Sequence, residues 1–498
     1  MKKLNYNSKQ MKAKSITIAL AYAMFGALVS CKETTEAPKP APVETVKAQA
    51  GPDQEILPTQ LVTLDGSAST GAEGKTFGWT IITKPSNSTM SLGQPTAVKP
   101  TFTPDIVGYY EFELTVTSGT EKSQDRVKVK AEYTEPITLD KPITTNTRLF
   151  DRFIDPAKPD YLVVKDIPVT AELTIDRDIR MAFDRDKSLS IEEKGTINAL
   201  GVSDQRIRFT GMQAQKSYWA GIKLYSPSTA NAFAFVDIEF GGSKIAFTNT
   251  KAGLAMFGNN KAQISLTDCN FISNDGYGLY VQNGSTLRAF SKNTFSKQTE
   301  AGILIDAYNA TVLDAASTFT GGNGRDVVEI SSSDIKDGQN VSWPAFTDKT
   351  PYRLLGNIAI ETGWTLKPGV TVEVARDAMI SINRNGYLSA KGTAENKVVI
   401  TGSSRNTTHW KGLIFYSVSN LNILENTEVS GGGSAVIVSG QRATITAYGK
   451  GAKLTIKNSR ISNSGGHGIM YTSDAEINAD AASTNTFAAN ASSNFYKL

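Results

Sequence analysis

Short apolar runs of four or five residues, each bounded by glycine, asparagine or serine, recur along residues 161–498. The clearest runs lie at 220–224, 252–256, 277–281 and 301–305, and their glycines are 32, 25 and 24 residues apart. No helical period persists beyond two turns of helix. Because one turn of such a chain cannot bury its own apolar face, the pattern predicts a β-solenoid in which each turn stacks on the next.

The second half of this region repeats the first. A shift of 191 residues places Tyr161 on Tyr352 and Trp219 on Trp410, and no gap is needed over residues 161–243. Further matched pairs are Gly195 with Gly386, Ala199 with Ala390, Gly201 with Gly392, Gly221 with Gly412 and Tyr225 with Tyr416. We therefore predict an internal duplication, with a first copy and its connecting segment at 161–345 and a second copy at 346–498.

The connection between the copies leaves two arrangements open. Residues 296–351 contain the glycine-rich stretch 321–324 and the polar stretch 334–340. Such stretches are typical of loops, so a break in the solenoid is compatible with the sequence. The two copies form either one continuous solenoid or two abutting lobes, and we slightly favour two lobes.

The second copy has an order of short motifs, at 386–393, 399–402, 410–413, 424–429, 454–461 and 465–469. This order resembles the repeats of the right-handed parallel β-helix in pectin-lyase-like proteins, and the resemblance covers most of residues 161–498. It implies an all-β body built as a duplicated right-handed parallel β-helix. The asparagines at its expected turns suit stacked ladders or left-handed backbone positions: Asn274, Asn426, Asn458 and Asn463.

Residues 48–133 have a different pattern, with short alternating strands separated by turns. Residues 110–116 alternate strictly, and Trp79 lies in an earlier strand at 77–81. This spacing predicts an antiparallel sandwich. Gly-Pro-Asp at 51–53, Leu-Asp-Gly-Ser-Ala-Ser at 64–69, Trp-Thr at 79–80 and Gly-x-Tyr at 108–110 closely resemble a PKD domain, an immunoglobulin-like module. The resemblance implies spacing or recognition at a cell surface, and residues 134–160 are expected to be a linker.

The N-terminus has the pattern of a bacterial export signal. Lysines precede an apolar run at 16–29, which is too short for a comfortable membrane span and ends in Leu28-Val29-Ser30-Cys31. These four residues resemble a lipobox. The resemblance implies that 1–30 is a lipoprotein signal peptide, that Cys31 is lipidated, and that the protein is anchored in the cell envelope, in the outer membrane. A plain secretory signal is the alternative, and the Pro-, Thr- and Glu-rich segment 31–47 is typical of a flexible tether.

Charge and cysteine content narrow the function classes. The formal charge of +4 comes from five lysines in residues 1–30, which contain no acidic residue. Without them, 47 basic residues balance 48 acidic ones, so we expect no nucleic-acid partner. The only cysteines are Cys31 and Cys269, so no internal disulfide framework or cysteine-based zinc site is expected. We expect Cys269 to fill space inside the solenoid as a small apolar group.

Candidates for catalysis are few. His467 lies in a Gly-His-Gly sequence, but the clustered aspartates that a polygalacturonase-type hydrolase needs are missing, and the first copy has Tyr277 at the matching position. The densest acidic run, Asp176, Asp178, Asp184 and Asp186, alternates with arginines, which is typical of a solvated, self-paired surface. His467 is thus a weak candidate catalytic residue, and these four aspartates are weak candidate calcium ligands. We expect no other cofactor.

Aromatic residues near strand ends suit stacking on sugar rings. The candidates are Tyr225, Tyr277, Tyr280 and Tyr416, whereas we expect Trp219 and Trp410 to pack in the core. We predict a surface-anchored lipoprotein that binds a glycan or another envelope component along the β-helix face, without catalysis. The alternatives are a polysaccharide lyase or glycoside hydrolase, favoured by carboxylates clustered in a groove, and a purely structural envelope protein.

Overall fold

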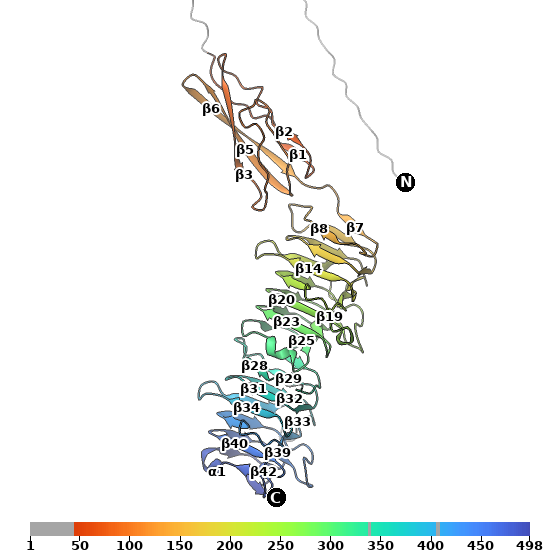
Figure 1. The fold of residues 1–498 in the computed structure, drawn as a ribbon, viewed down its shortest axis with the longest axis vertical. Coiled ribbons are helices and arrows are strands. Elements are labelled where there is room, and N and C mark those ends of the chain that lie inside the picture. Colours follow the sequence, from red (N-terminus) through yellow and green to blue (C-terminus); the bar gives the residue numbers. More distant parts are fainter. Residues whose placement is uncertain (1–43, 337–339, 405–408) are drawn as a thin grey trace, which may run out of the picture.

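The computed structural model describes residues 44–336, 340–404 and 409–498, which form an N-terminal sandwich followed by a long solenoid (Figure 1). Within these residues, no helix has the length and apolar character that a membrane span requires. The predicted signal peptide, Cys31 and most of the predicted tether lie outside the described residues. The body is all-β, as the sequence patterns predict.

The N-terminal sandwich packs a four-stranded sheet against a two-stranded one. The larger sheet has the order β1 (Gln54–Ile56), β6 (Glu121–Ala131), β5 (Gly108–Ser118) and β3 (Thr76–Thr83), and the smaller pairs β2 (Val62–Thr63) with β4 (Thr101–Phe102). Trp79, Phe112 and Leu114 are buried between them. The sandwich is mostly antiparallel, as predicted, but β1 pairs with β6 in parallel.

Five parallel sheets form the solenoid. A long sheet runs through both copies and contains β10 (Ile167–Val169), β13 (Ser188–Ile191), β16 (Gly221–Leu224), β19 (Ala252–Met256), β22 (Tyr277–Val281), β25 (Ala301–Ile305), β27 (Arg325–Ile330), β29 (Tyr352–Leu354), β32 (Thr371–Val374), β35 (Val398–Gly402), β38 (Thr427–Ser430), β41 (Arg460–Ser462) and β44 (Thr486–Ala488).

Two further sheets complete the first copy. The eight-stranded sheet contains β7 (Ile137–Leu139), β9 (Tyr161–Val163), β12 (Arg180–Phe183), β15 (Ile207–Gly211), β18 (Val236–Glu239), β21 (Asn270–Ile272), β24 (Thr294–Ser296) and β26 (Thr318–Gly321). The β14 sheet contains β8 (Thr147–Leu149), β11 (Glu172–Ile175), β14 (Thr196–Leu200), β17 (Ala232–Ala234), β20 (Gln263–Thr267) and β23 (Thr286–Ser291).

The last two sheets belong to the second copy. The β34 sheet contains β28 (Val341–Trp343), β31 (Gly363–Leu366), β34 (Tyr387–Lys391), β37 (Ile423–Glu425), β40 (Lys453–Lys457) and β43 (Glu476–Ile477). The β36 sheet contains β30 (Ile358–Ile360), β33 (Met379–Ile382), β36 (Gly412–Phe415), β39 (Ala443–Ala447), β42 (His467–Tyr471) and β45 (Phe495–Lys497). In the part of the chain that the structure describes, three short helices lie at corners: η1 (Gly258–Asn260), η2 (Asn309–Val312) and α1 (Ala481–Thr484).

The solenoid begins earlier than the sequence predicts. Residues 134–160 were expected to be a linker, but they contain β7, which pairs with β9, and β8, which pairs with β11. The prediction was wrong because these two strands are only three residues long and lie outside the duplicated region. The first rung of the solenoid therefore follows the sandwich almost directly.

Aromatic and apolar side chains stack inside the solenoid from one turn to the next. Phe271, Phe295 and Phe319 occupy successive rungs, with ring centroids 4.6 and 5.1 Å apart. Trp219 and Trp410 are fully buried, and Cys269 points into the same core, as predicted. Burial of these large side chains is the main source of stability for a stack of short strands.

Buried amides tie successive corners together. The Asn274 Oδ1 accepts a hydrogen bond from the backbone N–H of the preceding rung, and its Nδ2 donates to a backbone carbonyl there. Gln298 does the same for the rung that contains Asn274, and Asn323 for the rung that contains Gln298. Asn426, Asn458 and Asn463 instead take positive φ angles of 48–56°. Both predicted uses of turn asparagines therefore occur.

The two copies form one continuous solenoid, so the slight preference for separate lobes was wrong. Strand β27 of the first copy pairs in parallel with β29 of the second, which brings Glu329 opposite Arg353. Unexpectedly, equivalent strands of the two copies do not lie in the same sheet. Tyr161 and its counterpart Tyr352 begin β9 and β29, yet β9 lies in the eight-stranded sheet and β29 in the long sheet. The second copy is thus rotated about the solenoid axis, and equivalent residues point to different sides.

Glycine is required where neighbouring turns approach most closely, and one pair of glycines tests this. Gly276 has a φ of +85°, and a Cβ there would lie 2.1 Å from the Lys251 carbonyl oxygen. Gly322 has a similar φ of +75° but faces open space. We expect Gly276→Ala to lower the free energy of unfolding by about 2–4 kcal/mol and Gly322→Ala by only about 1 kcal/mol, measured by urea unfolding. Equal losses would contradict the close packing of the turns at Gly276.

Candidate functional site

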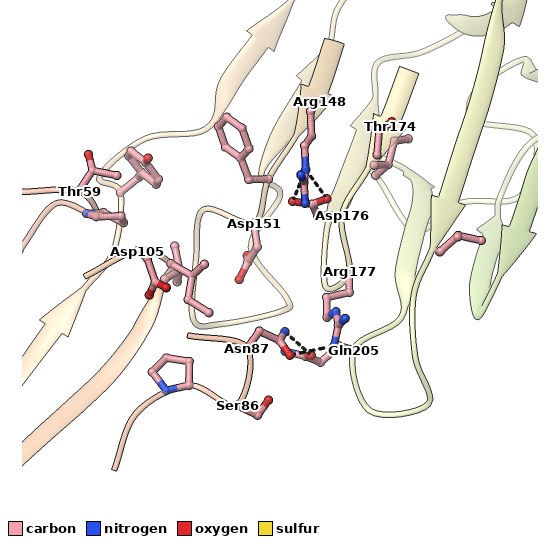
Figure 2. Close-up of a pocket in the computed structure, with 18 of the residues that line it drawn as sticks. Thr59, Ser86, Asn87, Asp105, Arg148, Asp151, Thr174, Asp176, Arg177 and Gln205 are labelled. Atoms are coloured by element: carbon pink, nitrogen blue, oxygen red, sulfur yellow. Dashed lines mark hydrogen bonds and ion pairs between the residues drawn. The ribbon is translucent and has the colours of Figure 1, made fainter. Parts of the chain in front are cut away.

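A cleft lies where the sandwich meets the first rungs of the solenoid. It encloses about 910 Å³. Figure 2 shows the sandwich residues Asn87 and Asp105 on one side, and Arg148, Asp151 and Asp176 of the solenoid on the other. Clefts between domains are common places for ligands, because two surfaces supply groups that neither has alone.

A polar bridge holds the two walls of the cleft together. The Asn87 Oδ1 accepts a hydrogen bond of 2.9 Å from Arg177 Nη1, and the Asn87 Nδ2 donates to Gln205 Oε1 at 3.4 Å (Figure 2). Asn87 belongs to a sandwich loop, whereas Arg177 and Gln205 lie at corners of the solenoid. The sandwich is therefore attached to the solenoid by this bridge as well as by the chain itself.

Two carboxylates of the cleft already accept hydrogen bonds from neighbouring side chains. Asp105 accepts hydrogen bonds from Ser88 Oγ, from the Thr89 N–H and hydroxyl, and from the Tyr110 hydroxyl. Burial raises its pKa, but these hydrogen bonds outweigh burial and lower the pKa to about 2. Asp176 accepts two bonds from Arg148 Nε, at 2.9 and 3.1 Å. Asp105 thus accepts four hydrogen bonds, whereas Asp176 accepts a single N–H that its two oxygens share and is paired with the Arg148 guanidinium.

The third carboxyl group of the cleft is held neutral. Burial, with further contributions from Asp160 and Asp178, raises the pKa of Asp151 to about 8. Asp160 is 2% exposed, and its two oxygens accept backbone N–H bonds of 2.7 Å from Arg152 and Arg180. Burial also raises the pKa of Asp160, but these two bonds oppose that effect and favour its ionised form, so we place the proton shared by the pair on Asp151.

The four predicted calcium ligands do not come together at one point. Asp176 pairs with Arg148 at the mouth of the cleft, and burial together with Asp160 and Asp204 raises the pKa of Asp178. Asp184 and Asp186 lie at another corner, where their backbone N–H groups bond to the eight-stranded sheet and to Tyr218. Nowhere in residues 44–336, 340–404 and 409–498 do three or more metal-ligating side chains form a group that could hold a metal ion. Calcium at these residues stays a prediction without structural support.

Three of the four predicted tyrosines gather on the outer surface of the long sheet. Tyr277 and Tyr280 are each only 8% exposed, and Phe247, from a hairpin that crosses the sheet, stacks over Tyr280 at 6.3 Å. The Tyr277 hydroxyl donates to Glu329 at 2.7 Å, and Tyr225 stacks on Phe257 at 4.3 Å. In this conformation, the rings form a covered apolar cluster and not an open platform for sugar rings.

The other predicted site residues lie in the second copy. Tyr416 follows β36 and meets Tyr448 edge-on, with ring centroids 6.0 Å apart. Because of the rotation of the second copy, Tyr416 and its counterpart Tyr225 are on different sheets. His467 is buried and stacks on Tyr496 at 4.2 Å, and its Nδ1 has no partner among the described residues. Nothing in this geometry supplies His467 with a catalytic partner.

Comparison with known proteins identifies both domains. A family model for a PKD domain matches residues 50–130, and one described as "Pectate-lyase like beta helix domain" matches residues 338–436. The chain contains a PKD domain and a pectate-lyase-like β-helix. A search of curated proteins finds no match. The β-helix is thus identified in its second copy, and the duplication and the stacked sheets extend it to the first.

Three solved structures are similar to part of this chain. The PKD domain from KIAA 1837 protein is 34% identical, over 17% of this chain and 83% of that chain, with a TM-score of 0.16. The PKD domain of human KIAA0319 is 21% identical, over 19% and 90%, also with a TM-score of 0.16. A nucleoside hydrolase-related hypothetical protein from Saccharophagus degradans, associated with carbohydrate metabolism, is 15% identical over 18% and 25%, with a TM-score of 0.16.

Uncommitted polar groups surround an exposed ring in the cleft between the PKD domain and the β-helix. Phe150 is 49% exposed, and both its backbone groups bond to the buried Tyr161 hydroxyl at 3.0 Å. The remaining groups have side chains without partners among the described residues: Thr59, Ser86, Thr174 and Asn198. An aromatic face beside free hydroxyl and amide groups is the chemistry that recognises a sugar.

Sequence reasoning singled out Asp176 of this cleft, as a candidate calcium ligand, but missed Phe150, Asp151 and Asn198. Phe150 and Asp151 fall in the segment that was assigned to a linker, and Asn198 lies in a strand without any motif. One signal was present in the sequence: Leu149 and Phe150 are adjacent large apolar residues, and in a strand only one of the two can face inward. Leu149 is buried and Phe150 is exposed.

The protonated Asp151 makes stability depend on pH in a defined direction. The folded protein keeps this proton up to about pH 8, whereas an aspartate of the unfolded chain releases it near pH 4. The folded state therefore loses stability as pH rises through this window. Asp151→Asn keeps a neutral donor towards Asp160, so we expect the variant to gain on the order of 2 kcal/mol over the wild type between pH 5 and pH 8.

Urea unfolding at several pH values measures this difference. The exposed Asp140→Asn serves as the control, because Asp140 makes no side-chain bond among the described residues. Its stability should run parallel to that of the wild type. If the free energy of unfolding of Asp151→Asn also followed that of the wild type at every pH, Asp151 would be ionised in the folded protein.

Proposed function

We propose that this protein is a non-catalytic glycan-binding protein of the bacterial cell envelope, and that the cleft between its PKD domain and its β-helix is the glycan site. A PKD domain joined to a pectate-lyase-like β-helix fits a surface or carbohydrate-associated protein. The observation that carries the proposal is the exposed Phe150 ring beside uncommitted hydroxyl and amide groups. This location differs from the predicted tyrosine face, which is covered.

The rigidity of Phe150 supports binding. The Tyr161 hydroxyl holds the Phe150 backbone N–H and C=O at 3.0 Å each, so the ring is presented on a fixed strand end. Burial raises the pKa of Tyr161 to about 12, which keeps this hydroxyl protonated and able to donate. A pre-organised ring loses little conformational entropy when a ligand docks on it.

The state of the carboxylates favours binding over catalysis. Hydrolysis of a glycosidic bond requires one carboxylic acid and one free carboxylate on opposite sides of the bond. Asp105 and Asp176 both line the cleft, but their oxygens are used by hydrogen bonds and by Arg148. A ligand in the cleft therefore meets a fully hydrogen-bonded carboxylate at Asp105 and an ion pair with Arg148 at Asp176.

A glycoside hydrolase is the second candidate function, because of Asp151. Its pKa of about 8 leaves it protonated at neutral pH, as a general acid must be. This hypothesis needs Asp176 to release Arg148 when substrate binds, so that Asp176 can act as the base. Reducing-sugar release would therefore depend on both Asp151 and Asp176.

Anchoring belongs to the same proposal. We infer that Cys31 is lipidated and that the tether at 31–47 holds the PKD domain away from the outer membrane, with the β-helix extending beyond it. We expect Cys31→Ser to move the protein from the membrane fraction to the soluble fraction and to abolish its labelling with radioactive palmitate. Unchanged labelling would rule out Cys31 as the lipidated residue.

Phe150→Ala tests the glycan site. We expect this variant to lose about tenfold in affinity for the polysaccharide that retains the wild type, because removing the ring costs about 1–1.5 kcal/mol of contact. Affinity gel electrophoresis against mixed-linkage β-glucan, galactomannan, xylan and polygalacturonate measures the retention.

The matched control is Tyr109→Ala, which removes a similarly exposed ring from β5, outside the cleft. It should be retained like the wild type. Loss of retention in both variants, or in neither, would contradict a site at Phe150. Release of reducing sugar by the wild type that is lost in Asp151→Asn and Asp176→Asn would replace binding with hydrolysis.

A further inference from the structure

A second groove lies on the first copy of the β-helix, at the corner between the long sheet and the β14 sheet. It encloses about 520 Å³, and Asn283, Ser285, Thr286 and Tyr308 are among its lining residues. Tyr308 is 44% exposed, and its hydroxyl has no partner among the described residues. Ser285 is only 3% exposed, yet its Oγ also lacks a partner in the described part of the chain. A buried hydroxyl left unpaired at a groove indicates a ligand or ordered water there.

The groove repeats the chemistry of the interdomain cleft. Each has one exposed aromatic ring, Phe150 or Tyr308, at the end of a rung. Each also has amide and hydroxyl side chains without partners among the described residues, which here are Asn283 and Thr286. The two hollows therefore share an aromatic ring and free polar side chains, and their charged lining residues differ: Arg148, Asp176 and Arg177 in the cleft, and Asp306, Asp334 and Lys336 in the groove.

The outer surface of the β14 sheet connects the two hollows. The strands β14, β17 and β20 contain no charged residue. Their outward ladder continues from Thr174 of the cleft, through Asn198 and Ala232, to Ser265. Gln263 of β20 then lies opposite Thr286, which lines the groove. In Figure 1, β14, β20 and β23 lie one below another along the same side of the solenoid.

The separation of the hollows follows from the rungs between them. Phe150 follows β8, Tyr308 precedes η2, and the strands β11, β14, β17, β20 and β23 lie between. Six steps of about 4.8 Å give a span of about 29 Å. A polysaccharide chain that is longer than this span can contact both hollows at once.

We propose that the groove at Tyr308 is a second subsite for the polysaccharide bound in the interdomain cleft, and that the polymer is neutral and crosses the outer surface of the β14 sheet. The proposal rests on the proposed function. A neutral polymer fits because β14, β17 and β20 offer no cation to pair with an acidic sugar and no anion to repel it. Arg288 of β23 reaches back to the start of β17, where its Nη2 donates to the Asn231 carbonyl oxygen at 2.7 Å, so its guanidinium is the one cation on this path among the described residues. Binding at the second subsite is intramolecular once the first is occupied, which raises the apparent affinity for long chains.

Chain length separates the two subsites experimentally. The polysaccharide of the panel that retains the wild-type protein is cut into fragments shorter than the span and fragments at least twice as long. We expect wild-type protein to bind the long fragments at least tenfold more tightly than the short ones, measured by titration calorimetry. Tyr308→Ala should lose this gain and keep the affinity of the interdomain cleft for short fragments, whereas Phe150→Ala should weaken binding of both fragment lengths.

Asn283→Ala is the second variant, because its side chain is exposed and has no partner among the described residues, and a milder loss limited to long fragments is expected. Melting temperatures equal to that of the wild type ensure that the variants are folded. The second subsite is overturned if Tyr308→Ala binds long fragments like the wild type, or if polygalacturonate is retained as strongly as the neutral polymers. The proposed function itself fails separately, if Phe150→Ala has no effect or no polysaccharide of the panel is retained.

Discussion

The structure depends on one constraint, that each turn of the solenoid must match the turns before and after it. Short strands of two to six residues have little stability alone, and their backbone groups bond only to the neighbouring rungs. The buried amides of Asn274, Gln298 and Asn323 extend this matching to the corners, where each joins two turns. Both copies contain a corner amide of this kind. The Oδ1 atoms of Asn231 and its counterpart Asn422 each accept a hydrogen bond from a backbone N–H of the preceding rung.

The same constraint explains the rotation at the junction of the copies. The long sheet continues without a break because β27 offers β29 a matching edge, although β29 is the repeat of a strand from another sheet. On the outward side of the long sheet, the ladder across the junction runs through Glu329, Arg353 and Glu373. The Arg353 Nη2 pairs with the Glu373 carboxylate at 2.7 Å. Pairing of edges, and not the alignment of repeats, determines how the second copy sits. A surface feature that occurs in both copies therefore lies on different sides of the solenoid in the two copies.

Free binding groups occur where regular stacking is interrupted. Within the regular turns, most buried amides and hydroxyls are used by the ladders. At the joint between the PKD domain and the β-helix, and at the corner that forms the Tyr308 groove, the pattern changes and some groups keep no partner within the described residues, among them the side chains of Thr59 and Ser86 and the Ser285 hydroxyl. Both hollows lie at these places, and both expose an aromatic ring. The domain joint and the irregular corner thus keep polar groups free to contact a ligand, whereas most such groups in the regular turns are already hydrogen bonded.

The sequence by itself determined the features that depend on local pattern. Alternation and repeated glycines predicted the sandwich and the solenoid, the shift of 191 residues identified the two copies, and the inward positions of Trp219, Trp410 and Cys269 were correct. Only the tertiary structure decided the rotation of the second copy, the burial of Tyr277 and Tyr280 beneath a hairpin, and the exposure of Phe150. It also decided that Asp151 holds a proton. The physical reason is that the alternation of side chains along a strand decides whether a residue points inward or outward. The partner of an outward side chain depends instead on segments far away in the chain.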